Sequence, residues 1–183
     1  LKEGTLLTNV FNRLARSCFY EAQKNFEGMM PLCSISEEVV VRAQKALHTY
    51  DGLMRKVELH TVMSLMDEFI RYSNKYWTDG IREAELSGDA DARRQVLADS
   101  FYLLRVCTLL MHPIVPFGCE KICMQMNFDA DEFFSWNYDF EGMGELCGAA
   151  ELASFRRVLI SSRSTKARSR RSSRCLRNCG RVF

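Results

Sequence analysis

The chain has 183 residues, of which 47% are hydrophobic and 26% are charged. That much apolar sequence can bury a core, which excludes a disordered protein. The formal charge of +2 hides two unlike parts, because residues 156–183 hold ten Lys or Arg and no acid. The other 15 basic and 23 acidic residues give residues 1–155 a net charge of −8, so a basic tail follows an acidic body.

Apolar residues recur at every third or fourth position between breaks of Gly, Pro and polar residues, which predicts helices. Ser34-Ile-Ser-Glu37 has the form of a capping box that opens the second helix, and Asp51-Gly52 predicts the turn that ends it. The other expected helices cover about 5–25, 58–76, 92–111 and 116–126. The predicted fold is all-α, an antiparallel bundle of about five helices, and residues 1–127 form this bundle.

The helix that ends at residue 111 is apolar on almost every side, which is typical of a helix in the middle of a bundle. Only Arg105 and Thr108 are expected to face water or a partner. Pro113 is expected to end the helix, and Pro116 fits the first turn of the next one. Residues 128–155 are aromatic and acidic, and we expect them to pack on the bundle as an extension.

The chain contains eight cysteines, and five of them lie in or beside apolar runs, at positions 18, 33, 107, 119 and 123. We interpret these five as small buried hydrophobes. No Cys-x-x-Cys occurs, and no histidine lies near a pair of cysteines or in a nucleophile pattern, so neither a metal site nor a catalytic residue is predicted.

The expected location is the cytoplasm, without a membrane-spanning segment. Because the chain starts at Leu1 and enters a helix at once, we expect it to be part of a longer protein.

The first helix carries the candidate binding residues. Stepping at 100° per residue places an apolar stripe on one face: Leu7, Val10, Phe11, Leu14 and Cys18. The opposite face then holds two amides and two guanidinium groups: Asn9, Asn12, Arg13 and Arg16. Amides read base edges through paired donors and acceptors, and arginine offers a planar fork to a base or a phosphate. This row is suited to an unpaired base, although any amphipathic helix also has a polar face that is merely solvated.

Several segments, in the same order and spacing over about residues 5–127, resemble the anticodon-binding domain of methionyl-tRNA synthetases. They are Asn9-Val-Phe-Asn-Arg13, Asn25-Phe-Glu-Gly28, Asn74-Lys75-Tyr76, and the late helix with its proline exit over 104–116. The resemblance implies the C-terminal bundle of a class I synthetase, which docks the anticodon stem-loop of tRNA. It also implies that Asn9 and Arg13 contact anticodon bases.

Two departures from the family pattern are typical of a divergent branch or a paralogue. About one extra helical turn separates Arg13 from Phe26, so the reading pair is alternatively Asn12 with Arg16. The family usually has a Pro-Trp pair several residues after Asn-Lys-Tyr, and its Trp stacks on an anticodon base. Here Trp77 follows Tyr76 directly and no proline precedes it, so Trp77 either stacks or covers the core.

The signature motifs of the class I catalytic domain, of the His-Ile-Gly-His and Lys-Met-Ser-Lys-Ser types, do not occur in the sequence. The resemblance therefore implies an upstream catalytic domain in the same parent chain, a methionine–tRNA ligase, and that domain would bind ATP and methionine. No cofactor is expected in this chain. Two alternatives remain: a helical protein-interaction module without RNA binding, and an RNA binder that acts through its basic tail.

The tail, residues 156–183, would ordinarily indicate an RNA-binding arm. The family bundle is often followed by a segment that resembles Leu-Pro-Pro-Arg-x-Asp-Phe-Phe. A shift of two bases in plausible codons from Ser154 onward can give a similar peptide, so we hypothesise that the sequence is translated out of frame from a point between about Glu145 and Phe155 onward. In either case we expect the tail to be disordered or poorly packed.

Overall fold

The computed structural model describes residues 6–31 and 33–134. Its elements are a π-helix, η1 (Leu6–Phe11), and six α-helices: α2 (Asn12–Asn25), α3 (Glu37–Arg55), α4 (Leu59–Ser87), α5 (Ala90–Met111), α6 (Pro116–Gln125) and α7 (Ala130–Phe133). Within the described ranges, α2 to α6 are the α-helices of ten residues or more. The predicted all-α bundle of about five helices is therefore confirmed.

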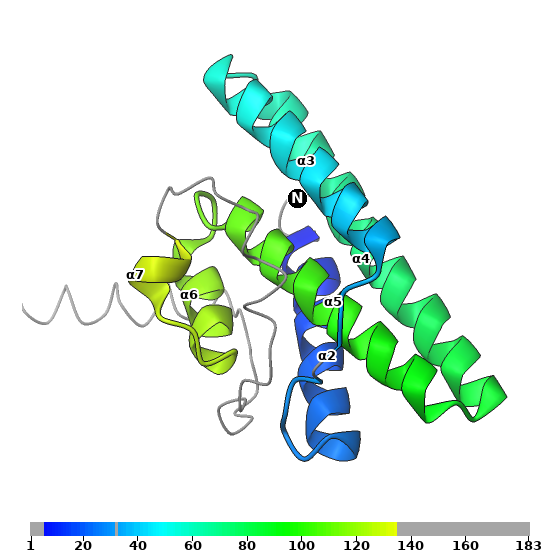
Figure 1. Ribbon diagram of the computed structural model, residues 1–183. Coiled ribbons are helices and arrows are strands. Elements are labelled where there is room, and N and C mark those ends of the chain that lie inside the picture. Colours follow the sequence, from blue (N-terminus) through cyan, green and yellow to red (C-terminus); the bar gives the residue numbers. More distant parts are fainter. Residues whose placement is uncertain (1–5, 32, 135–183) are drawn as a thin grey trace, which may run out of the picture.

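The long helices lie side by side (Figure 1). α3 and α4 form an antiparallel hairpin whose closed end projects at the top of the view, and α5 runs back along α4. α2 packs against α5 and α4, and η1 also contacts α4. α6 packs on α5, and the short α7 packs on α6.

α5 is the central helix, as its sequence predicts. Between Leu97 and Met111 every residue except Leu109 is buried. The ring of Phe101 meets that of Phe19 from α2 edge to face, with 5.7 Å between the ring centres. Burying this much apolar surface, at roughly 25 cal/mol per Å², is the main stabilisation that holds the surrounding helices in place.

The expectation that Arg105 and Thr108 face water or a partner is wrong. Thr108 is fully buried, and its hydroxyl donates to the carbonyl of Leu104 at 2.7 Å. Arg105 is 5% exposed, and its guanidinium carbon lies 5.1 Å and 5.3 Å from the ring centres of Phe128 and Phe133. The aromatic segment after α6 covers this side of α5, so the cation is buried against two rings.

The ends of α5 agree with the prediction. Gly88, with φ of 66°, occupies the left-handed position that ends α4, which glycine adopts without strain. The carboxylate of Asp89 then caps α5 by accepting from the backbone N–H groups of Asp91 and Ala92. Pro116 stands at the start of α6, where a missing N–H costs nothing.

The predicted turn at Asp51-Gly52 is wrong, because both residues lie inside α3. The side chain of Asp51 accepts from Arg55 Nε at 2.8 Å, one helical turn later. Glycine costs a helix about 1 kcal/mol relative to alanine, and the packing of α3 on α4 and α5 offsets this cost. The chain reverses instead at Val57, which has φ of 60°.

Two further boundaries differ from the prediction. The helix expected over 58–76 continues to Ser87 as α4, because Trp77 and Ala84, two turns apart, remain on its buried face. The expected capping box at the start of α3 is not formed. Ser36 is the N-cap without a capping side-chain bond, and its hydroxyl instead donates to Asp99 on α5 at 2.6 Å.

The extension enters the described residues only as far as Phe134. Over 128–134 it packs on the bundle, with Phe133 buried in the core cluster. The rest of it, 135–155, and the basic tail, 156–183, lie outside the described residues. Among the helices that are described, none has the length and apolar content needed to cross a membrane.

Candidate nucleic-acid interface

The candidate face begins in η1, the π-helix that leads into α2. A π-helix closes its hydrogen bonds five residues apart, so it has more residues per turn than an α-helix. The directions assigned at 100° per residue therefore do not hold for the residues before Asn12. Phe11 and Leu14 are buried as predicted, but Asn12 is only 7% exposed. Its predicted place on the outward polar face is wrong, because neighbouring segments cover this position even though it belongs to the regular part of the helix.

Three of the other candidates lie on the surface. Asn9, Arg13 and Arg16 are all exposed. Asn9 and Arg13 stand four residues apart across the junction between η1 and α2. Of the two alternative reading pairs, only Asn9 with Arg13 has both side chains exposed, because Asn12 is buried.

Trp77 lies in the interior, 8% exposed and part of the core cluster. α4 continues for ten residues beyond it to Ser87, so Trp77 is a mid-helix residue and not the last aromatic of a helix. In this arrangement its ring covers the core, which is the second of the two roles considered for it. The structure does not bring Trp77 onto the surface that holds Asn9 and Arg13.

The sequence interpretation missed Tyr20. This residue is 59% exposed, and it follows Arg13 by seven residues and Arg16 by four, so all three share one stripe of α2. Lys24 continues the stripe one turn later, with its ammonium nitrogen 6.0 Å from the centre of the Tyr20 ring. The helical spacing itself was the signal that could have found Tyr20.

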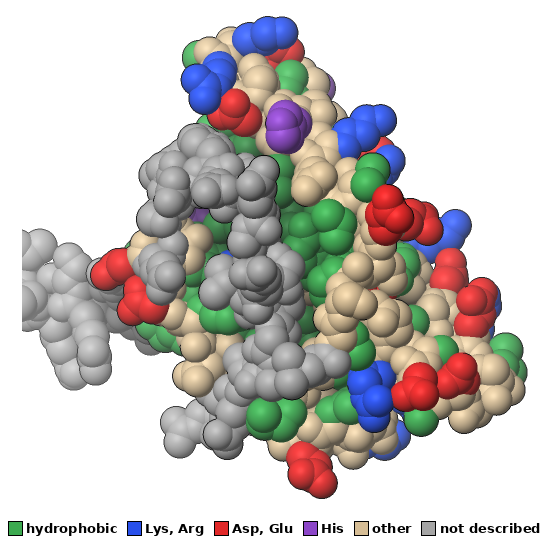
Figure 2. Space-filling model, in the orientation of Figure 1, with side chains coloured by type: hydrophobic (Ala, Val, Ile, Leu, Met, Phe, Trp, Pro, Cys, Tyr) green, Lys and Arg blue, Asp and Glu red, His purple; other side chains and the backbone are tan. Residues whose placement is uncertain are grey.

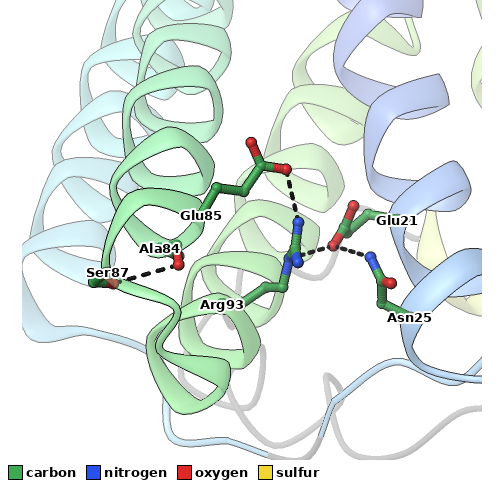
Figure 3. A network of polar contacts seen from close by, with 6 residues as sticks. All are labelled: Glu21, Asn25, Ala84, Glu85, Ser87 and Arg93. Carbon is green, nitrogen blue, oxygen red and sulfur yellow. Dashed lines mark hydrogen bonds and ion pairs between the residues drawn. The ribbon is translucent and has the colours of Figure 1, made fainter.

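The exposed stripe of α2 that holds Arg13, Arg16, Tyr20 and Lys24 is cationic, because the single acid of this helix lies on its buried side. Glu21 is 7% exposed and forms an ion pair of 2.7 Å with Arg93 of α5 (Figure 3). Its carboxylate also accepts from the amide of Asn25 at 2.6 Å, and Arg93 pairs with Glu85 of α4 at 2.8 Å. This network ties α2 to α5 and α4, and it leaves positive charge on the exposed side of α2.

Opposite charges are mixed elsewhere on the surface. Figure 2 shows acidic and basic side chains together over the α3–α4 hairpin, in the orientation of Figure 1. Several of them pair with each other, as Arg42 does with Glu68 at 2.7 Å and Arg71 with Asp67 at 2.8 Å. Within the part of the chain that the structure describes, Arg13 and Arg16 form no ion pair.

Asn74, the first residue of the Asn-Lys-Tyr segment, holds this face against α4. The amide of Asn74 on α4 donates to the carbonyl of Val10 in η1 at 2.9 Å and to that of Ile70 at 3.1 Å. A side chain that bonds a backbone carbonyl is a common accompaniment of an irregular helical turn. Lys75, the middle residue of the segment, is exposed.

Tyr76 belongs to a second polar cluster, centred on the fully buried Asp99 of α5. The Asp99 carboxylate accepts from the Tyr76 hydroxyl at 2.6 Å, from both the N–H and the hydroxyl of Ser36, and from the amide of Gln95. Burial, together with the hydrogen bond to Asp99, raises the pKa of Tyr76, so its hydroxyl stays protonated and continues to donate. The cluster joins the start of α3 to α4 and α5.

The described cysteines are poor nucleophiles. Burial raises the pKa of the Cys107 thiol to about 12, and it also raises the pKa of Cys18 and of Cys119. Cys33, expected to be buried, is instead partly exposed. Residues 6–31 and 33–134 contain no group of three or more His, Cys, Asp or Glu arranged to hold a metal ion.

The sequence profile of one known family, the anticodon-binding domain of tRNA ligases, matches residues 37–170. The match begins at α3 and runs into the basic tail. Methionine–tRNA ligases are also similar in sequence. That of Haloarcula marismortui is 25% identical over 123 residues, covering 67% of this chain and 17% of the relative. That of Methanoculleus marisnigri is 24% identical over 112 residues, covering 61% and 17%.

Solved structures agree on the fold. The free form of the Mycobacterium tuberculosis methionyl-tRNA synthetase superposes with a TM-score of 0.71 at 20% sequence identity. The superposition covers 85% of this chain and 32% of that one. The chain spans about a fifth of the length of the curated relatives that it matches. On the evidence of its helical architecture and of a profile match over more than half its length, the chain belongs to the family of anticodon-binding domains of tRNA ligases.

Proposed function

We propose that this chain binds the anticodon stem-loop of a tRNA through the outward face of η1 and α2. The observation that carries the proposal is the exposed row formed by Asn9, Arg13 and Arg16, on a helix whose only acid, Glu21, is buried and paired. The amide of Asn9 and the guanidinium groups that follow it can pair with base edges and neutralise phosphates at the same time.

Each residue has a distinct role in this proposal. Asn9 presents a donor and an acceptor to a base edge, and Arg13 offers its planar fork four residues later. Arg16 lies one turn further on and contacts the loop backbone. Asn12 and Trp77, both buried, support the face from inside: Asn12 at the junction of η1 and α2, and Trp77 through the packing of α4.

The parent protein follows from the same proposal. We infer a cytoplasmic methionine–tRNA ligase, in which a catalytic domain binds ATP and methionine and this domain selects the tRNA. The support is that the matched relatives are methionine–tRNA ligases and that this chain corresponds to a small part of each. Because residues 1–155 carry a net charge of −8, the body repels phosphate, and we expect weak affinity for isolated tRNA.

Fluorescence anisotropy with labelled stem-loops tests the proposal. The unmutated chain should bind the methionine anticodon loop more tightly than a loop with substituted anticodon bases. Arg13→Ala should abolish this discrimination, at a cost of about 1–3 kcal/mol for a bidentate contact. Arg55→Ala is the matched control, because Arg55 is an exposed arginine at the end of α3, far from α2 in Figure 1.

Equal binding of matched and mismatched loops by the unmutated chain would contradict the proposal. Complete indifference to RNA, also when the chain is joined to its upstream sequence, would support a protein-interaction module instead.

A further inference from the structure

The exposed stripe of α2 contains an aromatic ring that the proposed contacts with base edges and phosphates do not use. Tyr20 is 59% exposed, although tyrosine usually buries most of its ring. A single exposed ring on a protein surface needs no explanation. Tyr20 differs from such a ring because Arg13, Arg16 and Lys24 lie on the same stripe of α2.

The spacing along α2 suits two nucleotides of one loop. Tyr20 follows Arg13 by two helical turns, which is about 10 Å along the axis at 1.5 Å per residue. Arg16 stands between them, where it can meet the phosphates that join the two nucleotides. Along this face, Arg13 can contact a base edge, Arg16 can contact the RNA backbone, and the Tyr20 ring offers a flat apolar surface.

The ring is accessible to a base. Lys24 is the cation that lies over Tyr20, and its nitrogen is 6.0 Å from the ring centre, at the outer limit for a cation–π contact. Such a loose contact yields readily, and the released ammonium can move to a phosphate. The ring of Trp77, in contrast, is buried in the core and is not available for stacking.

We propose that Tyr20 is a stacking platform for a second nucleotide of the bound loop, beyond the one that Asn9 and Arg13 read. The inference rests on the proposed function. Unpaired bases in recognised RNA loops are commonly splayed out and stacked on aromatic side chains. Because every base has a π-face, Tyr20 contributes affinity and register, while Asn9 and Arg13 contribute selectivity.

The test uses the full chain and a methionine anticodon stem-loop in which 2-aminopurine replaces one loop nucleotide at a time. In the unmutated chain, the fluorescence of one loop position should be quenched on binding. Tyr20→Phe keeps the ring and should keep both the quenching and the affinity within about twofold. Tyr20→Ala should lose the quenching and bind about 5- to 100-fold more weakly.

Phe117→Ala is the matched control, since Phe117 is an aromatic residue of similar exposure, 56%, on α6. It should leave quenching and affinity unchanged. Unaltered quenching and affinity in Tyr20→Ala would overturn the inference, and if Arg13→Ala still abolished discrimination, the proposed function would stand without it. If the unmutated chain bound matched and mismatched loops equally, the proposed function would fail and the inference with it.

Discussion

The side-chain amide of Asn74 donates to the backbone carbonyl of Val10 at 2.9 Å, which joins α4 to the π-helix η1 across 64 positions of sequence. The same amide donates to the carbonyl of Ile70 at 3.1 Å, so both of its hydrogens are used. The bond holds the irregular turn that precedes α2 against α4, beside the exposed Asn9 and the buried Asn12.

Asn74→Ala removes both bonds and leaves the Val10 carbonyl without this donor. We expect a loss of about 1–2 kcal/mol in the free energy of unfolding, because a part-buried acceptor loses its partner. Amide hydrogen exchange over residues 6–13 should accelerate, and binding of the anticodon loop should weaken. Hydrogen exchange followed by mass spectrometry measures the local effect.

Asn74→Asp sharpens this prediction, because a carboxylate has the same shape but cannot donate to a carbonyl. It should behave like Asn74→Ala. Thr49→Ala is the control, since its hydroxyl bonds only the carbonyl of Lys45 within α3, on the surface. Faster exchange over 6–13 in the control, or none in either Asn74 variant, would contradict the role given to Asn74.

Asp99→Asn tests the buried cluster. Its carboxylate accepts four hydrogen bonds from Ser36, Tyr76 and Gln95, and an amide would turn two hydrogens toward these donors. The expected loss is about 2–4 kcal/mol in the free energy of unfolding, measured by urea denaturation.

Asp67→Asn is the matched change on the surface, where Asp67 pairs with Arg71 one turn away. Its expected effect is below about 1 kcal/mol, since exposed pairs contribute little. If both variants lost the same stability, Asp99 would not be the centre of a buried cluster.

Thiol reactivity tests the packing of α2 on α5. Burial raises the pKa of Cys107 to about 12, so almost no thiolate forms at pH 8, and the solvent cannot reach the sulfur. Iodoacetamide at pH 8 should modify Cys33, which is partly exposed, before it modifies Cys18, Cys107 or Cys119. Peptide mapping by mass spectrometry gives the order, and urea should equalise the rates. Early modification of Cys107 in the native protein would show that α5 is not the enclosed central helix.

The salt dependence of RNA binding separates the α2 face from the basic tail. Three cations, Arg13, Arg16 and Lys24, predict a slope of log K against log salt of about −2 to −3. The ten basic residues of 156–183 would instead give about −7 to −9 if all of them bound phosphate. Arg13→Ala should reduce the magnitude of this slope by nearly one, whereas Arg55→Ala should leave the slope unchanged. A slope near −7 that Arg13→Ala does not alter would assign binding to the tail.

The sequence predicted those parts of the fold that local pattern controls. The central helix and its proline exit follow from apolar spacing and from residues with one favoured backbone role. The burial of Arg105 was not predictable from local pattern, because it depends on Phe128 and Phe133, which belong to a later segment of the chain.

The candidate site was predicted in part. The exposure of Asn9 and Arg13 agrees with an amphipathic helix, but the burial of Asn12 depends on neighbouring segments, which the periodicity of one helix does not show. Tyr20 was within reach of the sequence, since it continues the spacing of Arg13 and Arg16.

The most direct test of the account is to find where the loop touches the protein. An anticodon stem-loop that carries 4-thiouridine in its loop can be crosslinked to the full chain by light, and the modified residues can be identified by mass spectrometry. The account predicts crosslinks within residues 9–24. An excess of the unlabelled matched loop should abolish them, an equal excess of a mismatched loop should leave most of them, and Arg13→Ala should reduce them. Crosslinks confined to 156–183, or spread over the α3–α4 hairpin, would contradict it.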